Sequence, residues 1–92
     1  MYGKMTQRGI DMTLNHAFAL RVKEILKEKK MTQYRLEQLT GMYHSTMTAI
    51  LTHTTEASNF KTMAIIIREL GMTFEEFFDS PLFDYNNLDI DD

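Results

Sequence analysis

The chain contains no cysteine, and no apolar run in it approaches the roughly 18 residues that a membrane-spanning helix needs. The missing thiols exclude disulfides and thiolate metal sites. The N-terminal stretch MYGKMTQRGIDMTLNHA has no apolar core of signal-peptide length, and we predict a loose or partly helical arm over residues 1–13. We therefore expect a cytoplasmic protein with no membrane partner.

Residue patterns that would support catalysis or a cofactor are also missing. The sequence shows no nucleophile–base pair, no phosphate-binding glycine loop and no metal-ligand spacing. His44 and His53 lie nine positions apart, without a carboxylate or cysteine nearby to complete a zinc site. We therefore expect no metal, no small-molecule cofactor and no enzymatic activity.

The chain does contain enough apolar material for one small core. Of its 92 residues 43% are hydrophobic, and a chain of this length can bury about 60 to 70% of the surface that it exposes when unfolded. Its net charge is −3, but residues 1–60 hold eight Lys or Arg against five Asp or Glu, whereas residues 61–92 hold two against eight. A basic first part can therefore meet nucleic acid while the acidic second part points away.

The segment that starts at Met31 predicts a short helix with a sharp end. Thr32 can cap the helix through its hydroxyl, and Met31 and Leu36 are spaced as a hydrophobic staple. Leu36 and Leu39 form a narrow apolar stripe, and Gly41 ends the helix because glycine accepts the left-handed backbone conformation. The other side chains of this helix are expected to face outward: Gln33, Tyr34, Arg35, Glu37 and Gln38.

A second short helix follows after a turn of three or four residues. Met47, Ile50 and Leu51 repeat at helical spacing and are predicted to face the core. The opposite face is polar, small and uncharged, and it comprises His44, Ser45, Thr48, Ala49 and Thr52. Two short helices around one glycine are typical of a helix-turn-helix, whose second helix enters the major groove of DNA.

The span from about Phe18 to Phe83 resembles a Cro/C1-type helix-turn-helix domain, the family of phage repressors and many bacterial regulators. The matching segments are TQYRLEQLTG, STMTAIL and ELGMTFEEFFDSPLF. The resemblance implies an all-α fold, a five-helix lambda-repressor-like DNA-binding domain with its helix-turn-helix at helices 2 and 3, assigned here to residues 14–79. It also implies a transcriptional regulator, with repression favoured, that binds an inverted-repeat operator as a homodimer.

The resemblance also implies roles for individual residues. Gln33 matches a glutamine that typically braces a DNA phosphate and the first residue of the recognition helix, where His44 stands. With residues 43–51 in the major groove, we expect base edges to be read by His44, Ser45, Thr48 and Ala49. The residues expected to contact phosphate or to brace the interface are Gln33, Tyr34, Arg35, Tyr43, Thr46, Thr52, Asn59 and Lys61. For His44, Thr46 and Thr48 an ordinary exposed helical position is the alternative interpretation.

Two features depart from the family pattern. Tyr43 occupies the place of a serine cap, and an aromatic side chain caps a helix poorly. The loop that follows the recognition helix lacks the usual Asn-Gly-Lys run, and Glu56 adds a negative charge there. No Lys or Arg lies between Gly41 and Phe60, so DNA affinity should depend on helix-end amides and hydroxyls more than on point charges.

Three further helices are expected around this pair. The first runs from about Leu14 or Asn15 to Lys29, with Asn15 or Thr13 as its cap. Its inward residues are predicted to be Phe18, Val22, Ile25 and Leu26, and its outward residues Arg21, Lys23, Lys27, Lys29 and Lys30. The fourth begins near Ser58 or Asn59 and ends at Gly71, and its apolar stripe is predicted to be Phe60, Met63, Ile66, Ile67 and Leu70.

The fifth helix is predicted from a capping box of Thr73 and Glu76, with Met72 and Phe77 as staple and Pro81 as its limit. The aromatic residues around it are expected in the core, with a dimer contact as the alternative: Phe74, Phe77, Phe78 and Phe83. Residues 80–92 are expected to form an acidic C-terminal tail. Because this tail also contains apolar side chains, we predict that part of it packs against the helical domain.

A second function class stays open beside the regulator. A protein-interaction module, antitoxin-like or anti-repressor-like, could keep this fold and use the altered loop and the acidic tail to hold another protein. A footprint over a palindrome would favour the regulator, whereas weak sequence-independent DNA binding with a co-purifying partner would favour the module.

Overall fold

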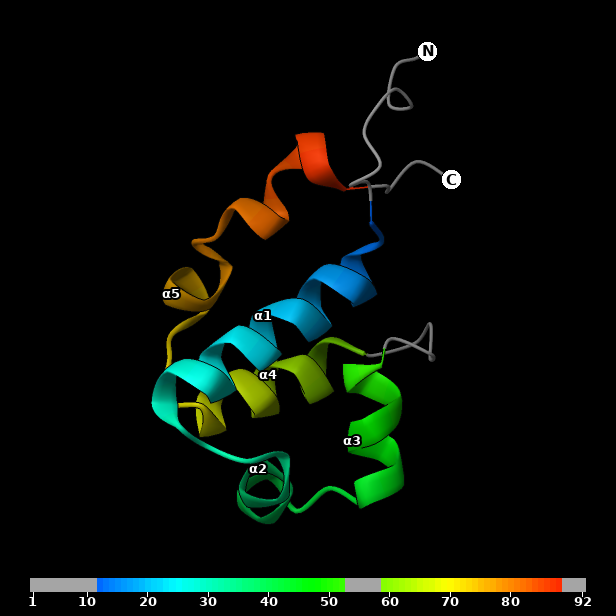
Figure 1. The fold of residues 1–92 in the computed structure, drawn as a ribbon, viewed down its shortest axis with the longest axis vertical. Coiled ribbons are helices and arrows are strands. Elements are labelled where there is room, and N and C mark those ends of the chain that lie inside the picture. The colour runs from blue at the N-terminus through cyan, green and yellow to red at the C-terminus, as the bar shows by residue number, and fades with distance from the viewer. Residues whose placement is uncertain (1–11, 53–58, 89–92) are drawn as a thin grey trace.

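The computed structural model describes residues 12–52 and 59–88, and these form α-helices and two short 3-10 helices with no strand (Figure 1). The elements in chain order are α1 (Leu14–Lys29), α2 (Gln33–Thr40), α3 (His44–Leu51), α4 (Phe60–Glu69), α5 (Phe74–Phe78), η2 (Pro81–Phe83) and η3 (Tyr85–Asn87). The predicted all-α fold with five helices is confirmed. Within the described ranges no helix is long and apolar enough to cross a membrane.

Local capping chemistry sets the helix starts. The side chains of Thr13, Thr32, Asn59 and Thr73 each accept a hydrogen bond from a backbone amide in the first turn of α1, α2, α4 and α5. Thr73 and Glu76 form the predicted capping box, with both reciprocal hydrogen bonds present. These bonds satisfy amides that have no partner within the helix.

The helix ends use the left-handed backbone region. Gly41 and Gly71 have φ values of +73° and +79° and stop α2 and α4, as predicted. Lys30 ends α1 with φ of +56°, a conformation in which a residue with a Cβ is strained. The Met31 amide donates to the Leu26 carbonyl at 2.8 Å across this end, so the chain turns directly from α1 into α2.

One core joins the helices. The α1 helix packs against α3 and η2, α2 packs against α3 and α4, and α4 packs against α5. The buried core residues are Phe18, Val22, Ile25, Leu26, Leu36, Met47, Ile50, Leu51, Ile66, Ile67, Leu70 and Phe77. The staple residues Met31 and Met72 are half-buried against this core, as the two predicted staples require.

The predicted places of Phe60 and Arg21 are wrong. Phe60 was expected in the apolar stripe of α4, but it lies in the first turn, is 64% exposed and contacts the Phe74 ring instead, with ring centroids 5.5 Å apart. Arg21 was expected on the solvent face of α1, but its side chain is only 13% exposed. Its Nε donates to the Phe77 carbonyl at 2.6 Å and its Nη2 to the Glu76 carbonyl at 2.9 Å, because the short α5 leaves these carbonyls unpaired.

The tail docks on α1 as far as Leu88. Leu88 is buried and forms an isolated bridge with Met12, whose amide donates to the Asn87 carbonyl at 3.1 Å. Phe83 packs on Phe78, with ring centroids 4.8 Å apart. Figure 1 shows the last described residues beside the start of α1, at the end of the molecule away from α2 and α3.

Candidate nucleic-acid interface

The α2 and α3 helices form a helix-turn-helix at one end of the molecule (Figure 1). Three residues, Gly41–Tyr43, connect them, within the predicted turn length. Met47, Ile50 and Leu51 of α3 are buried, which holds this helix on the core and turns its other face outward. The predicted split of α3 into a core face and a polar face is confirmed.

The outward side of α3 carries small polar groups. His44, Ser45 and Thr46 are exposed in its first turn, while Thr48 and Ala49 are half-buried one turn later. Thr52, also exposed, donates its hydroxyl to the Thr48 carbonyl at 2.7 Å. Such groups can form hydrogen bonds with base edges or phosphates without carrying a formal charge.

Tyr43, the N-cap residue of α3, makes no side-chain capping bond, which agrees with the expectation that an aromatic residue caps poorly. Its ring is largely exposed beside the turn. A planar exposed side chain at this place can lie along a DNA backbone, so the expected bracing role stays a prediction.

Gln33 of α2 bridges the two helices. Its side-chain amide donates to Thr48 Oγ1 at 3.0 Å and to Glu37 Oε2 at 2.8 Å. The resemblance implied a brace between Gln33 and the first residue of the recognition helix. Here Gln33 reaches α3 at Thr48, one turn further on, and is linked to His44 through Glu37.

Glu37 is the residue that the sequence interpretation misplaced. It was expected to face solvent, but it is only 8% exposed and lies under the α2–α3 pair. Its Oε2 is 2.7 Å from Nδ1 of His44, so the expectation that His44 has no carboxylate nearby is also wrong. The physical reason is that α3 crosses α2 so that its first turn lies over Glu37, a relation that the spacing along one helix does not contain.

The hydrogen bond from Gln33 holds the pKa of the Glu37 carboxyl below its ordinary value of 4.5, and the contact with His44 acts in the same direction. Burial opposes both by disfavouring the charge. The carboxylate is therefore ionised at neutral pH, and it places one negative charge at the base of the outward face of α3.

The start of α2 offers a surface suited to phosphate. Tyr34 and Arg35 are exposed there, and both are held by Gln38, which donates to the Tyr34 hydroxyl at 3.3 Å and accepts from Arg35 at 3.5 Å. The first amides of a helix and its dipole attract anions. Arg35 thus adds a cation beside a helix N-terminus.

The two expected contacts on α4 lie apart from this pair. Asn59 uses its side-chain oxygen to cap α4, accepting from the Thr62 amide at 2.8 Å, and Lys61 is exposed in the first turn of the same helix. The structure therefore joins Gln33, His44 and Thr48 in one network and places Asn59 and Lys61 on a separate element. The predictions about His53 and Glu56 lie outside the described residues.

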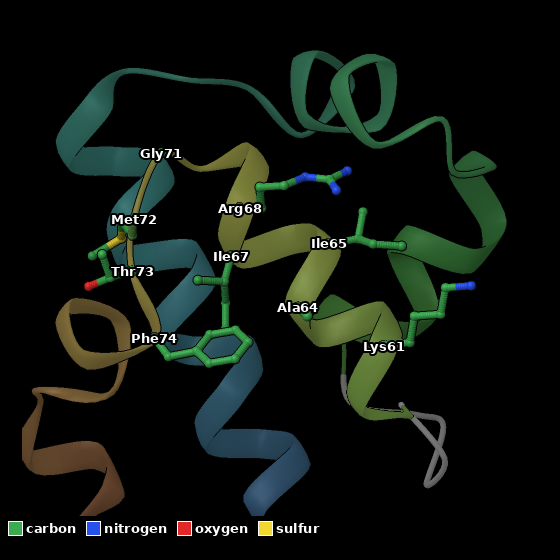
Figure 2. Close-up of a pocket in the computed structure, with 9 residues that line it drawn as sticks. All are labelled: Lys61, Ala64, Ile65, Ile67, Arg68, Gly71, Met72, Thr73 and Phe74. Carbon is green, nitrogen blue, oxygen red and sulfur yellow. The ribbon is translucent and has the colours of Figure 1, made fainter.

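A second exposed surface lies between α4 and α5. Phe77 is buried and Phe83 half-buried, as the core interpretation expected, but for Phe74 and Phe78 it is wrong, because they are 44% and 37% exposed. Phe74 pairs with the exposed Phe60. Figure 2 shows the adjoining groove of about 690 Å³, which runs from α4 into the start of α5. Its lining residues are Lys61, Ala64, Ile65, Ile67, Arg68, Gly71, Met72, Thr73 and Phe74.

Within residues 12–52 and 59–88, no group of three or more His, Cys, Asp or Glu side chains is placed so that it could hold a metal ion. At the interface, His44 pairs with the carboxylate of Glu37.

Comparison with known proteins gives one match. A family model described as a Cro/C1-type HTH DNA-binding domain matches residues 21–81, which is 61 of the 92 residues and includes all of α2, α3, α4 and α5. Neither a curated protein nor a solved structure matches the chain.

Proposed function

The chain belongs to the Cro/C1-type helix-turn-helix family of DNA-binding domains, and we propose that it is a sequence-specific transcriptional regulator that acts as a repressor. In this proposal it works in the cytoplasm, with residues 43–51 inserted in the major groove of an operator. Bound there, it would block access of the transcription machinery to the site.

The observation that carries the proposal is the outward face of α3. The helix is fixed by three buried side chains, and its exposed first turn presents Ser45 beside His44. A rigid helix with hydroxyl and imidazole groups can donate to or accept from base edges, and Thr48 can add its methyl group against a thymine methyl. Ser45 is the single residue that we expect to read a base most directly.

Phosphate contacts would fix the helix in the groove. The exposed start of α2 with Tyr34 and Arg35 provides amides, a phenol and one cation on the side next to α3. Asn59 and Lys61 provide a second such place at the start of α4. Two helix starts that grip the backbone at separate points would set the depth and the direction of α3.

A homodimer on an inverted repeat is part of the proposal. The exposed Phe60–Phe74 pair beside the groove of Figure 2 supports it, because two copies related by a two-fold axis would cover each other's aromatic rings. Recognition helices would then lie about 34 Å apart.

Sedimentation of the wild-type chain and of Phe74→Ala tests the dimer. We expect the substitution to weaken self-association while each monomer stays folded. A wild-type chain that stays monomeric both free and on its selected duplex would contradict this part of the proposal.

Selection of bound fragments from random duplex DNA, followed by sequencing, tests the function itself. We expect a palindromic site. On that site Ser45→Ala should weaken binding by about 1 to 3 kcal/mol with little change in melting temperature, and on scrambled DNA it should change little. Asp79→Asn, an exposed residue at the end of α5, is the control variant.

Equal losses for Ser45→Ala on selected and scrambled duplexes would reduce Ser45 to a backbone contact. Weak binding without any selected sequence, together with a co-purifying protein, would instead favour the interaction module.

A further inference from the structure

Four side chains at the junction of α2 and α3 form a closed hydrogen-bonded ring. Gln33 Nε2 donates to Glu37 Oε2 at 2.8 Å and to Thr48 Oγ1 at 3.0 Å. His44 Nδ1 lies 2.7 Å from the same Glu37 oxygen, and His44 Nε2 lies 3.4 Å from Thr48 Oγ1. Every member of the ring therefore contacts two others.

The chemistry of the ring decides where the protons lie. An ionised carboxylate can only accept hydrogen bonds, so the 2.7 Å contact requires a proton on Nδ1 of His44. In the neutral imidazole Nε2 is then the acceptor. The Thr48 hydroxyl, which already accepts from Gln33, can donate weakly toward it.

Exposure separates the two halves of the His44–Glu37 pair. The His44 side chain is 76% exposed, whereas that of Glu37 is 9% exposed. The imidazole is therefore held from beneath by a fixed anion, and because its other edge is exposed, a base could replace the 3.4 Å contact of Thr48 with Nε2. A buried hydrogen-bond acceptor such as Glu37 can fix the orientation of an exposed side chain such as His44 before DNA binds.

We propose that Glu37 is a positioning residue of the DNA interface, which fixes the proton of His44 on Nδ1 and so makes Nε2 the atom presented to the base. The inference deepens the proposed function and rests on it. With the proton on Nδ1, Nε2 of His44 would accept from an adenine or cytosine amino group, whereas the Nε2–H tautomer would donate to guanine N7 or O6. The base preferred opposite His44 should therefore depend on Glu37.

The tautomer of His44 should depend on Glu37. Thr48, the other described partner of the imidazole, can donate or accept through its hydroxyl, so it does not fix the proton on either ring nitrogen. The described ion pairs of the neighbouring helices, Arg21–Glu24 on α1 and Arg68–Glu69 on α4, do not include His44. Arg35, exposed on α2, is bonded to Gln38.

The positioning part can be tested without DNA. Nitrogen-15 spectra of the histidine rings at pH 8 report which ring nitrogen carries the proton, and His44→Gln identifies the signals of His44 among the three histidines. We expect the Nδ1–H form in the wild-type chain. In Glu37→Ala we expect the Nε2–H form to appear, whereas Glu37→Gln should keep Nδ1–H because its amide oxygen can still accept.

The specificity part uses the duplex selected by the wild-type chain. The position read by His44 is the one whose preference disappears in His44→Ala, and all four base pairs are placed there in turn. At pH 8 we expect the wild-type chain to favour a base that presents an amino group there, and Glu37→Ala to move the preference toward guanine by roughly fivefold, the value of one hydrogen bond. Glu37→Gln, whose amide oxygen still accepts, should keep the wild-type preference, and so should the control Asp79→Asn, an exposed residue at the end of α5.

The outcomes separate two failures. A wild-type chain that selects no duplex overturns the proposed function, and with it the assignment of a base to His44. A wild-type chain that selects one, with unchanged ring protonation and unchanged base preference in Glu37→Ala, overturns the positioning role alone. If Glu37→Ala does not fold, Glu37→Met decides: its side chain has a similar length but lacks the oxygen that accepts from Nδ1, so it should change the ring protonation and the base preference in the direction expected for Glu37→Ala.

Discussion

Arg21 should contribute more to stability than any other charged side chain of α1. Its guanidinium is mostly buried, lies 5.8 Å from the centroid of the Phe77 ring and donates to two carbonyls at the end of α5. Arg21→Ala removes both donors at once. The carbonyls of Phe77 and Glu76 then lose their partners, and α5 keeps only its apolar contact with α1, in which the Phe77 ring packs on Phe18.

The size of the effect follows from these contacts. A hydrogen bond from a charged group contributes about 1.5 to 3 kcal/mol, and the Glu76 carbonyl, at an exposed bond, can recover part of this from water. We therefore expect Arg21→Ala to lower the free energy of unfolding by about 2 to 3 kcal/mol. For a domain of this size that corresponds to a fall in melting temperature of roughly 10 to 20 °C. Arg21→Lys should lose about half as much, because an ammonium cannot reproduce the planar fork.

Urea unfolding followed by circular dichroism measures this directly. Lys23→Ala, an exposed cation on the same helix, is the matched control and should change stability by no more than about 0.5 kcal/mol. Glu24→Ala isolates the exposed Arg21–Glu24 pair, which should contribute at most about 1 kcal/mol. If Arg21→Ala and Lys23→Ala had the same midpoint, the guanidinium would not be holding α5 to α1.

Three further outcomes are expected. Lys30→Gly should raise stability by about 1 kcal/mol in thermal melts, because it relieves the left-handed strain at φ of +56°, and a lower melting temperature would contradict this. The lowered pKa of the Glu37 carboxyl should stabilise the fold fully above pH 4.5, the ordinary pKa, and this stabilisation should disappear as the pH falls through the pKa of the folded state. Acid unfolding of Glu37→Gln should lack this pH-dependent contribution. Identical acid-unfolding profiles of the two chains would rule the contribution out. Because no Lys or Arg lies between Gly41 and Phe60, the log–log dependence of operator affinity on salt should be shallow, and fluorescence anisotropy showing a slope of about −8 or steeper would refute this.

Local chemistry explains why the helix boundaries could be predicted. Thr32 and Thr73 cap the helices that follow them, and Gly41 and Gly71 end the helices that precede them, all through contacts within a few residues. Such contacts depend on neighbours along the chain and are visible in its spacing. The core face of α3 was predictable for the same reason.

The contacts that join different helices could not be predicted. Gln33 and Glu37 are four positions apart on one helix, and their bond is readable from that spacing. The bond from Glu37 to His44 depends on the angle at which α3 crosses α2, and that of Arg21 to α5 joins residues 56 positions apart. Phe60 was misplaced because helical periodicity does not show that the first turn of α4 extends past the core.

The bridge between Met12 and Leu88 has a practical consequence for engineering. It brings the two ends of the described fold together on the side remote from α3. A reporter or effector domain fused beyond either end would therefore leave α3 accessible to DNA. Ends this close can also be spliced by a short linker, and the chain reopened elsewhere, to give a circularly permuted binder.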